Sequence, residues 1–208
     1  MSLNFTNSKN LGADAFWVLD MFKDGLSDCL KFRTLENKRL AYRTSESQFA
    51  VFDRLSPPEL EVTGSPYATF VQDQNLSAPL RFMLALSMVN HVLPELLTSE
   101  LKQGPARWDL HPEIGGVRGQ NFPGFIPTGL TFVFLIARHI IQDRIAAQRF
   151  FVDHNPLSAN GIILLEPHFK GETTLSGKLT IDESWLEFFL GFSELDRSGS
   201  IKYPKTRT

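Results

Sequence analysis

The chain has 208 residues, 42% of them hydrophobic, and a formal net charge of −2, which is the composition of one or two folded domains and excludes a disordered chain. The balanced charge gives no general attraction to nucleic acid. A single cysteine, Cys29, excludes a disulfide framework and a zinc site made of several cysteines. There is no leader-like N-terminus, and the longest uncharged stretch is strongly apolar only over Leu130–Ala137, so we expect a cytoplasmic protein without membrane association.

The N-terminal third begins with a clear helical pattern. Apolar residues recur at three- and four-residue steps through residues 13–33, which predicts an amphipathic helix. Cys29 lies on its apolar stripe, so we expect a buried, unreactive thiol. Residues 34–75 are less regular, and within them Phe49–Phe52 and Tyr67–Val71 are candidates for short strands.

The middle of the chain is predicted to contain two long helices separated by a loop. The first helix starts at Ser77, is kinked or restarted at Pro94, and runs to about Leu101. Residues 103–129 form a loop rich in Gly and Pro, and loops of this length are often functional. An apolar helix is then expected from Leu130 to about Phe151.

The C-terminal part is predicted to contain a hairpin and a short helix. Ile162–Leu165 and Lys178–Ile181 are expected to pair across the intervening loop. Ser184 to Glu187 has the spacing of a capping box before a helix that ends near Gly191.

These elements predict an α+β fold in which a helical N-terminal part precedes a winged-helix-like domain. The order helix, helix, hairpin, helix is typical of winged helices and also of other small α+β domains. We place a helical and irregular subdomain at residues 1–75, the winged-helix-like domain at 76–195, and an exposed basic tail or linker at 196–208.

One stretch has the spacing of a phosphate-binding loop. Gly124, Gly129 and Thr131 match that pattern, but Leu130 occupies the position of the lysine that contacts the β- and γ-phosphates. We therefore expect Thr128 to cap a helix and no nucleotide to bind there.

No other pattern predicts catalysis, a cofactor or a metal. The histidines lack the spacing of a helical metal site and have no cysteine near them in sequence, so we expect no metal ligands; ligands that only the fold brings together are the alternative. No nucleophile elbow is present, and the acids near residue 183 suit the first turn of a helix. The five histidines are His91, His111, His139, His154 and His168.

DNA binding is an open alternative for the helix expected over residues 130–151. Arg138 and Arg149 are eleven residues apart and would share one helical face, whereas Arg144 would lie well around from them. The near-zero net charge and the apolar first turns of this helix do not favour tight binding to phosphates.

Five motifs occur in order in the second half of the chain: His111–Gln120, Gly124–Gly129, Phe134–Ala137, Gly161–Pro167 and Leu175–Thr180. Together they resemble the N-terminal winged-helix region that precedes the ATPase module in a group of bacterial AAA+ ATPases, some of them encoded with contractile injection systems. The resemblance covers about residues 76–190. Leu130 departs from it, because the family often has an acid there. The ATPase module would follow this chain, so the resemblance implies no catalytic residue within it.

We therefore expect a non-catalytic protein-interaction or regulatory module that binds a protein partner, either an ATPase module or a component of an assembly. The alternative is a DNA-binding winged-helix protein, and an enzyme of unrecognised type is a third possibility. We predict that the loop from Gly115 to Thr128 contacts the partner through Arg118, Gln120, Phe122 and Phe125, since arginine and exposed aromatic residues are favoured at interfaces. Alternatively, Phe122 and Phe125 fill the core beneath this loop.

Overall fold

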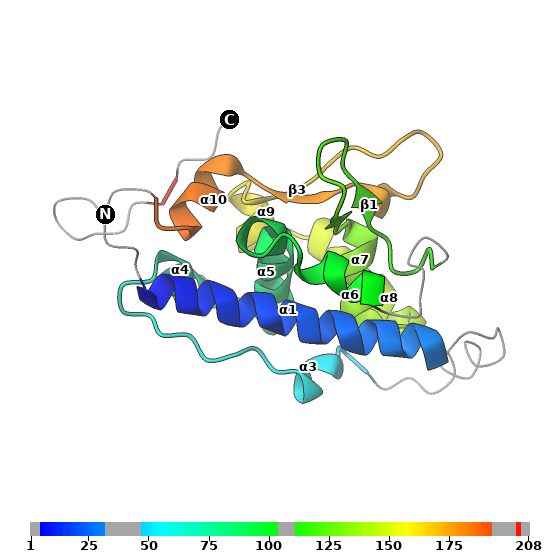
Figure 1. Ribbon diagram of the computed structural model, residues 1–208, viewed down its shortest axis with the longest axis horizontal. Helices are drawn as coiled ribbons and strands as arrows, with labels where there is room; N and C mark the ends of the chain where they lie inside the picture. Colours follow the sequence, from blue (N-terminus) through cyan, green and yellow to red (C-terminus); the bar gives the residue numbers. More distant parts are fainter. Residues whose placement is uncertain (1–4, 32–46, 104–110, 193–202, 205–208) are drawn as a thin grey trace.

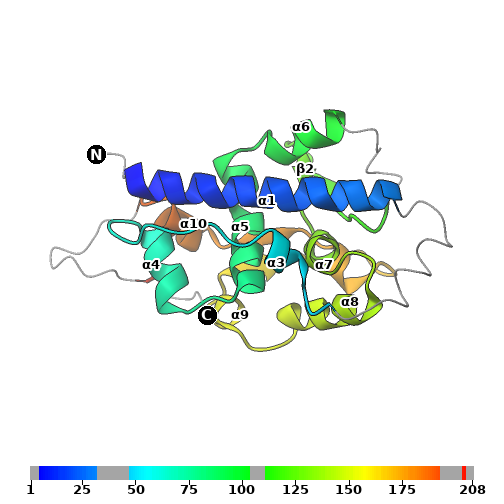
Figure 2. The same ribbon diagram turned by 90° about the horizontal axis from the view of Figure 1, so that it is seen from below.

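The computed structural model describes residues 5–31, 47–103, 111–192 and 203–204 (Figures 1 and 2). The described part is an α+β fold, mostly helical, with two small antiparallel sheets that each pair two strands. Its elements are α1 (Phe5–Lys31), α3 (Val51–Arg54), α4 (Pro66–Asp73), α5 (Ala78–Val92), α6 (Leu96–Gln103), β1 (Val117–Arg118), β2 (Phe125–Ile126), α7 (Gly129–Ala137), α8 (Ile141–Gln148), η2 (Arg149–Phe151), α9 (Pro156–Ala159), β3 (Ile163–Leu165), η3 (Thr174–Ser176), β4 (Leu179–Ile181) and α10 (Glu183–Phe189).

Helix α1 is the longest element and lies along one side of the molecule, where it packs against α4, α5, α6 and α7 (Figures 1 and 2). It starts eight residues before the predicted start at residue 13. The inner face of α1 is fully buried at Val18, Met21 and Phe22. These residues belong to one hydrophobic cluster that extends to Phe189. The residues before and after the predicted boundary near residue 76 therefore share one core.

The prediction of short strands at Phe49–Phe52 and Tyr67–Val71 is wrong. Val51–Arg54 and Pro66–Asp73 are helices. Ser65 caps the second of these by accepting a hydrogen bond from the Ala68 amide, and proline occupies the first turn of the helix. Its apolar side chains, spaced three and four residues apart, are buried as on a helix face. A short apolar run alone does not distinguish a helix from a strand.

The irregular segment between α3 and α4 runs along α1 (Figure 2). Polar side chains of α1 form hydrogen bonds with the backbone of this segment. Asn10 donates to the carbonyl of Glu61 at 2.7 Å and accepts from its amide at 3.1 Å, and the Trp17 indole donates to the Leu55 carbonyl at 2.8 Å. These bonds replace the partners that a helix or sheet would supply to the backbone.

Helix α5 begins after Ser77 as predicted, and the chain restarts after Pro94 as α6. The axes of the two helices differ by 85°. In the described part of the chain no single helix is long and apolar enough to cross a membrane; only the bent pair formed by α5 and Leu96–Lys102 reaches the required length and composition.

The helix predicted over residues 130–151 is instead α7 and α8, separated by a turn at Arg138. Arg138 has a φ of 51°, in the left-handed region that few non-glycine residues adopt. Its guanidinium group is buried and donates to the Met21 carbonyl at 2.9 Å and to Asp24 Oδ2 at 3.0 Å. These contacts with α1 accompany the turn and explain why an uninterrupted apolar pattern does not form one helix.

Asp24 joins α1 to α3 and to the α7–α8 turn. Arg54 binds both of its carboxylate oxygens, at 3.2 and 3.0 Å, and Arg138 binds one of them. Gly25 makes room for this contact, because a Cβ atom there would lie 2.5 Å from Arg138 Nη1. Burial alone raises the pKa of Asp24, but the hydrogen bonds from Arg54 and the charge of Arg138 outweigh it, so this pKa lies below its ordinary value of 3.8.

We expect Asp24→Asn to lower the free energy of unfolding by about 1–3 kcal/mol at neutral pH. Because the folded-state pKa of Asp24 is depressed, its stabilising effect is complete above the ordinary value of 3.8 and is lost as the pH falls below that value. Urea unfolding from neutral pH to about pH 3 should therefore show the two proteins converging in acid. Asp20→Asn, at an exposed position on the same helix, should have little effect; a gap between wild type and Asp24→Asn that stays constant in acid would contradict this prediction.

The predicted hairpin is confirmed. Strands β3 and β4 are antiparallel, with Ile163 opposite Ile181 and Leu165 opposite Leu179. A further segment lies beside β4 just before α7, because the Leu179 amide donates to the Pro127 carbonyl at 2.9 Å and Thr128 bridges to Lys178. The short helix after this hairpin is also confirmed, although Asp182 caps it, not Ser184.

An aromatic cluster fills the space between α4 and α10. Phe70 packs edge-on against Trp185, with ring centroids 5.3 Å apart, and Tyr67 packs similarly against Phe189. Tyr203 stacks on Trp185 and donates to Asp73 at 2.6 Å. The predicted exposed tail is therefore wrong at Tyr203, while residues 196–202 and 205–208 of that tail lie outside the described residues.

Candidate functional site

The predicted partner loop is a small hairpin, and its four candidate residues differ in exposure. Strands β1 and β2 pair with Arg118 opposite Phe125. Arg118 and Gln120 are exposed and Phe122 is half-buried. Phe125 is only 2% exposed, and its ring centroid lies 5.3 Å from that of Phe22 in α1. The prediction that Phe125 contacts a partner is therefore wrong, because its side chain fills the core, as the alternative proposed.

Thr128 caps α7, as predicted. Its hydroxyl accepts from the Thr131 amide at 3.3 Å, and the Thr131 hydroxyl accepts from the Thr128 amide at 3.0 Å. Thr128 also accepts from the Gly116 amide at 3.1 Å, and the Gly129 amide donates to the Gly177 carbonyl at 3.3 Å. Backbone amides that a phosphate-binding loop would present to an anion are thus bonded within the protein.

A buried charged cluster lies between α1, α4 and α5. Arg81 donates to Asp14 through Nε at 2.9 Å and to the Pro58 carbonyl at 2.7 Å, and the Tyr67 hydroxyl also donates to Asp14. Burial is the largest cause that raises the pKa of Tyr67, and the charge of Asp14 is the next largest. The adjacent cavity, lined by Asp14, Tyr67 and apolar side chains, has a volume of about 10 Å³ and holds at most one water molecule. This cluster has no room for a substrate, so we interpret it as structural.

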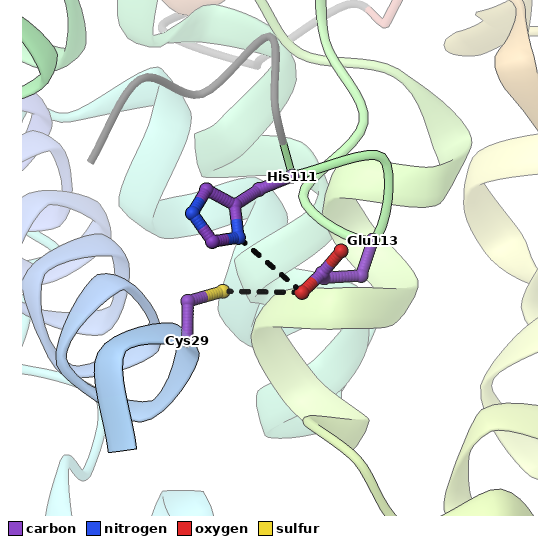
Figure 3. A group of neighbouring side chains, drawn as sticks. All are labelled: Cys29, His111 and Glu113. Atoms are coloured by element: carbon purple, nitrogen blue, oxygen red, sulfur yellow. Dashed lines mark hydrogen bonds and ion pairs between the residues drawn. The ribbon is translucent and has the colours of Figure 1, made fainter. Parts of the chain in front are cut away.

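The fold brings together three side chains that can bind a metal (Figure 3). Cys29 lies in the last turns of α1, and His111 and Glu113 lie in the turn before β1. Glu113 Oε1 is 4.0 Å from Cys29 Sγ and 3.5 Å from His111 Nδ1, and all three ligand atoms lie within 4.8 Å of one another. Sequence spacing did not indicate this group because Cys29 and Glu113 are 84 residues apart. The sequence-based expectation of no metal ligands rested on spacing, and this group is of the kind left open there, a set of ligands that only the fold brings together.

The order of these three groups does not suit nucleophilic catalysis by cysteine. In a nucleophilic triad the imidazole lies between the nucleophile and the acid, so that it can accept the proton of the nucleophile. Here the carboxylate, and not the imidazole, is the common partner, because Glu113 Oε1 contacts both the thiol and the imidazole (Figure 3). The arrangement instead places one sulfur, one nitrogen and one oxygen donor around a common point.

Helix α8 exposes apolar side chains that the sequence analysis did not select. Ile141 and Ile145 are 49% and 61% exposed and lie four residues apart on one helix face. Phe169, in the loop between β3 and β4, is 81% exposed. The four-residue spacing of Ile141 and Ile145 is present in the sequence. It indicates a shared exposed face only when the helix is known to be divided at residue 138.

The three arginines considered under the DNA-binding alternative lie in different environments. Arg138 is buried against Asp24 and lies in the turn before α8. Arg144 is half-buried and donates to the Arg138 carbonyl at 2.8 Å. Arg149 alone of the three is exposed. The prediction that Arg138 and Arg149 share a helical face is wrong because the helix is broken between them.

No protein-family model, curated protein or solved structure significantly matches this chain.

Proposed function

We propose that this chain is a cytoplasmic, non-catalytic protein-interaction module with a winged-helix domain. The order of elements supports the domain assignment. With α6, the β1–β2 hairpin, η2 and α9 inserted between them, the elements that correspond to the first helix, first strand, second and third helices and wing of a winged helix occur in this order: α5, the segment at Pro127 and Thr128, α7, α8, and the hairpin β3–β4. The isolated bridge between Thr128 and Lys178 lies where a winged helix places a third strand beside its wing.

The observation that carries the proposed function is the exposed face of α8. In a winged helix that binds DNA, the helix in this position presents basic and polar groups to the phosphates and base edges. Here it presents Ile141 and Ile145, while Arg144 bonds to the backbone of the turn. Exposed apolar side chains that lie together on one face are typical of protein interfaces.

The partner we propose is an AAA+ ATPase module or a component of the assembly on which such an ATPase acts. The resemblance of residues 76–190 to the N-terminal region of bacterial AAA+ ATPases supports this choice. Arg118 and Gln120, both exposed on the β1–β2 hairpin, are proposed as additional contacts.

Ile145→Glu should weaken capture of the partner from a lysate of the source organism by about 30-fold or more, as expected for an interface hot spot. Gln142→Glu is the matched control, because it adds the same charge at an exposed position of the same helix but removes no apolar side chain. Both variants should unfold within about 0.5 kcal/mol of wild type. Equal capture by wild type and Ile145→Glu would contradict the role of this face.

The DNA-binding alternative makes the opposite prediction. If α8 binds a protein, random duplex DNA should bind only in the ordinary non-specific range, with a Kd of about 10⁻⁴–10⁻⁶ M at physiological salt. Fluorescence anisotropy measures this directly. A Kd well below that range that rises in Arg149→Ala, but not in Ile145→Glu, would support a DNA-binding protein and overturn our proposal.

A further inference from the structure

We propose that Cys29, His111 and Glu113 bind one Zn²⁺ ion, a property independent of the proposed function. The three residues supply a thiolate sulfur, an imidazole nitrogen and a carboxylate oxygen, and zinc is the common biological cation that accepts all three donor types. Calcium and magnesium prefer sites made of oxygen donors and do not suit a thiolate.

The spacing of the ligand atoms fits such an ion. Tetrahedral zinc with ordinary bond lengths of about 2.0–2.3 Å separates neighbouring ligand atoms by about 3.4–3.6 Å. The distance from His111 Nδ1 to Glu113 Oε1 is 3.5 Å, and that from Cys29 Sγ to the same oxygen is 4.0 Å. All three ligand atoms lie within 4.8 Å of one another, so an inward movement of the thiol would bring the set to the spacing that the ion requires.

Both sides of the site are held in place by the fold. Cys29 is 1% exposed on α1, which the core fixes along its length. In the facing turn, the Ile114 amide donates to the His111 carbonyl at 3.0 Å, and the Ile114 side chain is fully buried. Gly115 completes the turn with a φ of 69°, where a Cβ atom would lie 2.7 Å from the Thr128 hydroxyl. The turn therefore presents His111 and Glu113 on the same side, toward α1 (Figure 3).

The site is accessible and its charges balance. The side chains of His111 and Glu113 are 17% and 15% exposed, so an ion can enter from their side and keep a water molecule as its fourth ligand. A thiolate, a carboxylate and a neutral imidazole together neutralise the two positive charges of zinc. Binding releases the thiol proton to solvent, so affinity should increase with pH through the range in which thiols ionise.

Cobalt substitution tests the site at the level of one residue. Cys29 is the only cysteine in the chain, so any thiolate-to-metal charge-transfer band must come from it. Titration of the metal-free full chain with Co²⁺ should produce this band with a stoichiometry of one per chain, and Zn²⁺ should abolish it by displacement. Absence of the band at saturating Co²⁺ would overturn the proposal.

Variants separate this site from adventitious binding. His111→Ala and Glu113→Gln should each weaken Zn²⁺ binding, measured by competition with a chromophoric chelator. Loss of an outer-shell partner weakens metal binding about 10–100-fold, and loss of a direct ligand should weaken it by at least as much. His168→Ala and Glu187→Gln, at exposed positions of the same residue types, should bind Zn²⁺ like wild type. Cys29→Ser should also lose the charge-transfer band, but because Cys29 is buried, the two partly exposed ligands provide the decisive measurements. Tight binding that survives both variants would place the ion elsewhere and overturn the proposal.

Zinc should also stabilise the folded chain, because the unfolded chain does not hold the three ligands together. The thermal midpoint should fall on addition of EDTA and recover with excess Zn²⁺ in wild type and in His168→Ala. It should be insensitive to EDTA in His111→Ala and Glu113→Gln. Coincident melts of the wild type with and without EDTA, after loading with one equivalent of Zn²⁺, would contradict binding at this site.

Discussion

Asp14→Asn is expected to lower the free energy of unfolding by about 3–5 kcal/mol, because it leaves the positive charge of Arg81 buried without its anion. The Asp14 side chain is 2% exposed and bonds both Arg81 and Tyr67, so no solvent is available to compensate for its loss. Urea denaturation followed by tryptophan fluorescence and circular dichroism measures the change.

Two comparisons identify the cause of this loss. Asp20→Asn removes a carboxylate from an exposed position of the same helix and should change stability by no more than about 0.5 kcal/mol. Asp14→Asn combined with Arg81→Met should cost clearly less than the sum of the single changes, since each single change leaves a buried charge without its partner. Additive losses would mean that Asp14 and Arg81 do not act as a pair.

Phe125→Ala is expected to lower the free energy of unfolding by about 3–5 kcal/mol, the usual effect of removing a buried phenylalanine ring. Phe125 is 2% exposed and packs on Phe22, while its amide and carbonyl bond Thr98 and Asn90 at 3.0 and 2.9 Å. The ring therefore anchors the β1–β2 hairpin to α1, and the two backbone hydrogen bonds anchor it to α5 and α6.

The matched control is Phe169→Ala, which makes the same chemical change at an 81% exposed position and should alter stability by no more than about 0.5 kcal/mol. Arg118→Ala should be similarly neutral for stability, because its side chain is exposed opposite Phe125. A neutral Phe125→Ala would restore this residue as a partner contact. A large loss in Arg118→Ala would show that the hairpin depends on its outer face as well.

Local patterns in the sequence were sufficient wherever a few neighbouring residues decide the structure. The helix after Ser77, the break at Pro94 and the cap at Thr128 follow from helix periodicity, proline and capping chemistry, which act within a few residues. The hairpin of β3 and β4 follows from two short apolar runs on either side of one loop.

The tertiary structure decided the features that depend on residues distant in sequence. A buried ion pair with Asp24 in α1 turns the chain at Arg138, where the apolar pattern predicts continuous helix. Contact with Phe22 buries Phe125, and the packing of the turn at residues 111–115 against α1 brings His111 and Glu113 to Cys29. Periodicity and spacing report only which residues share a local face. The free energy that fixes these three features comes from contacts across the core, and no window of neighbouring residues contains both partners.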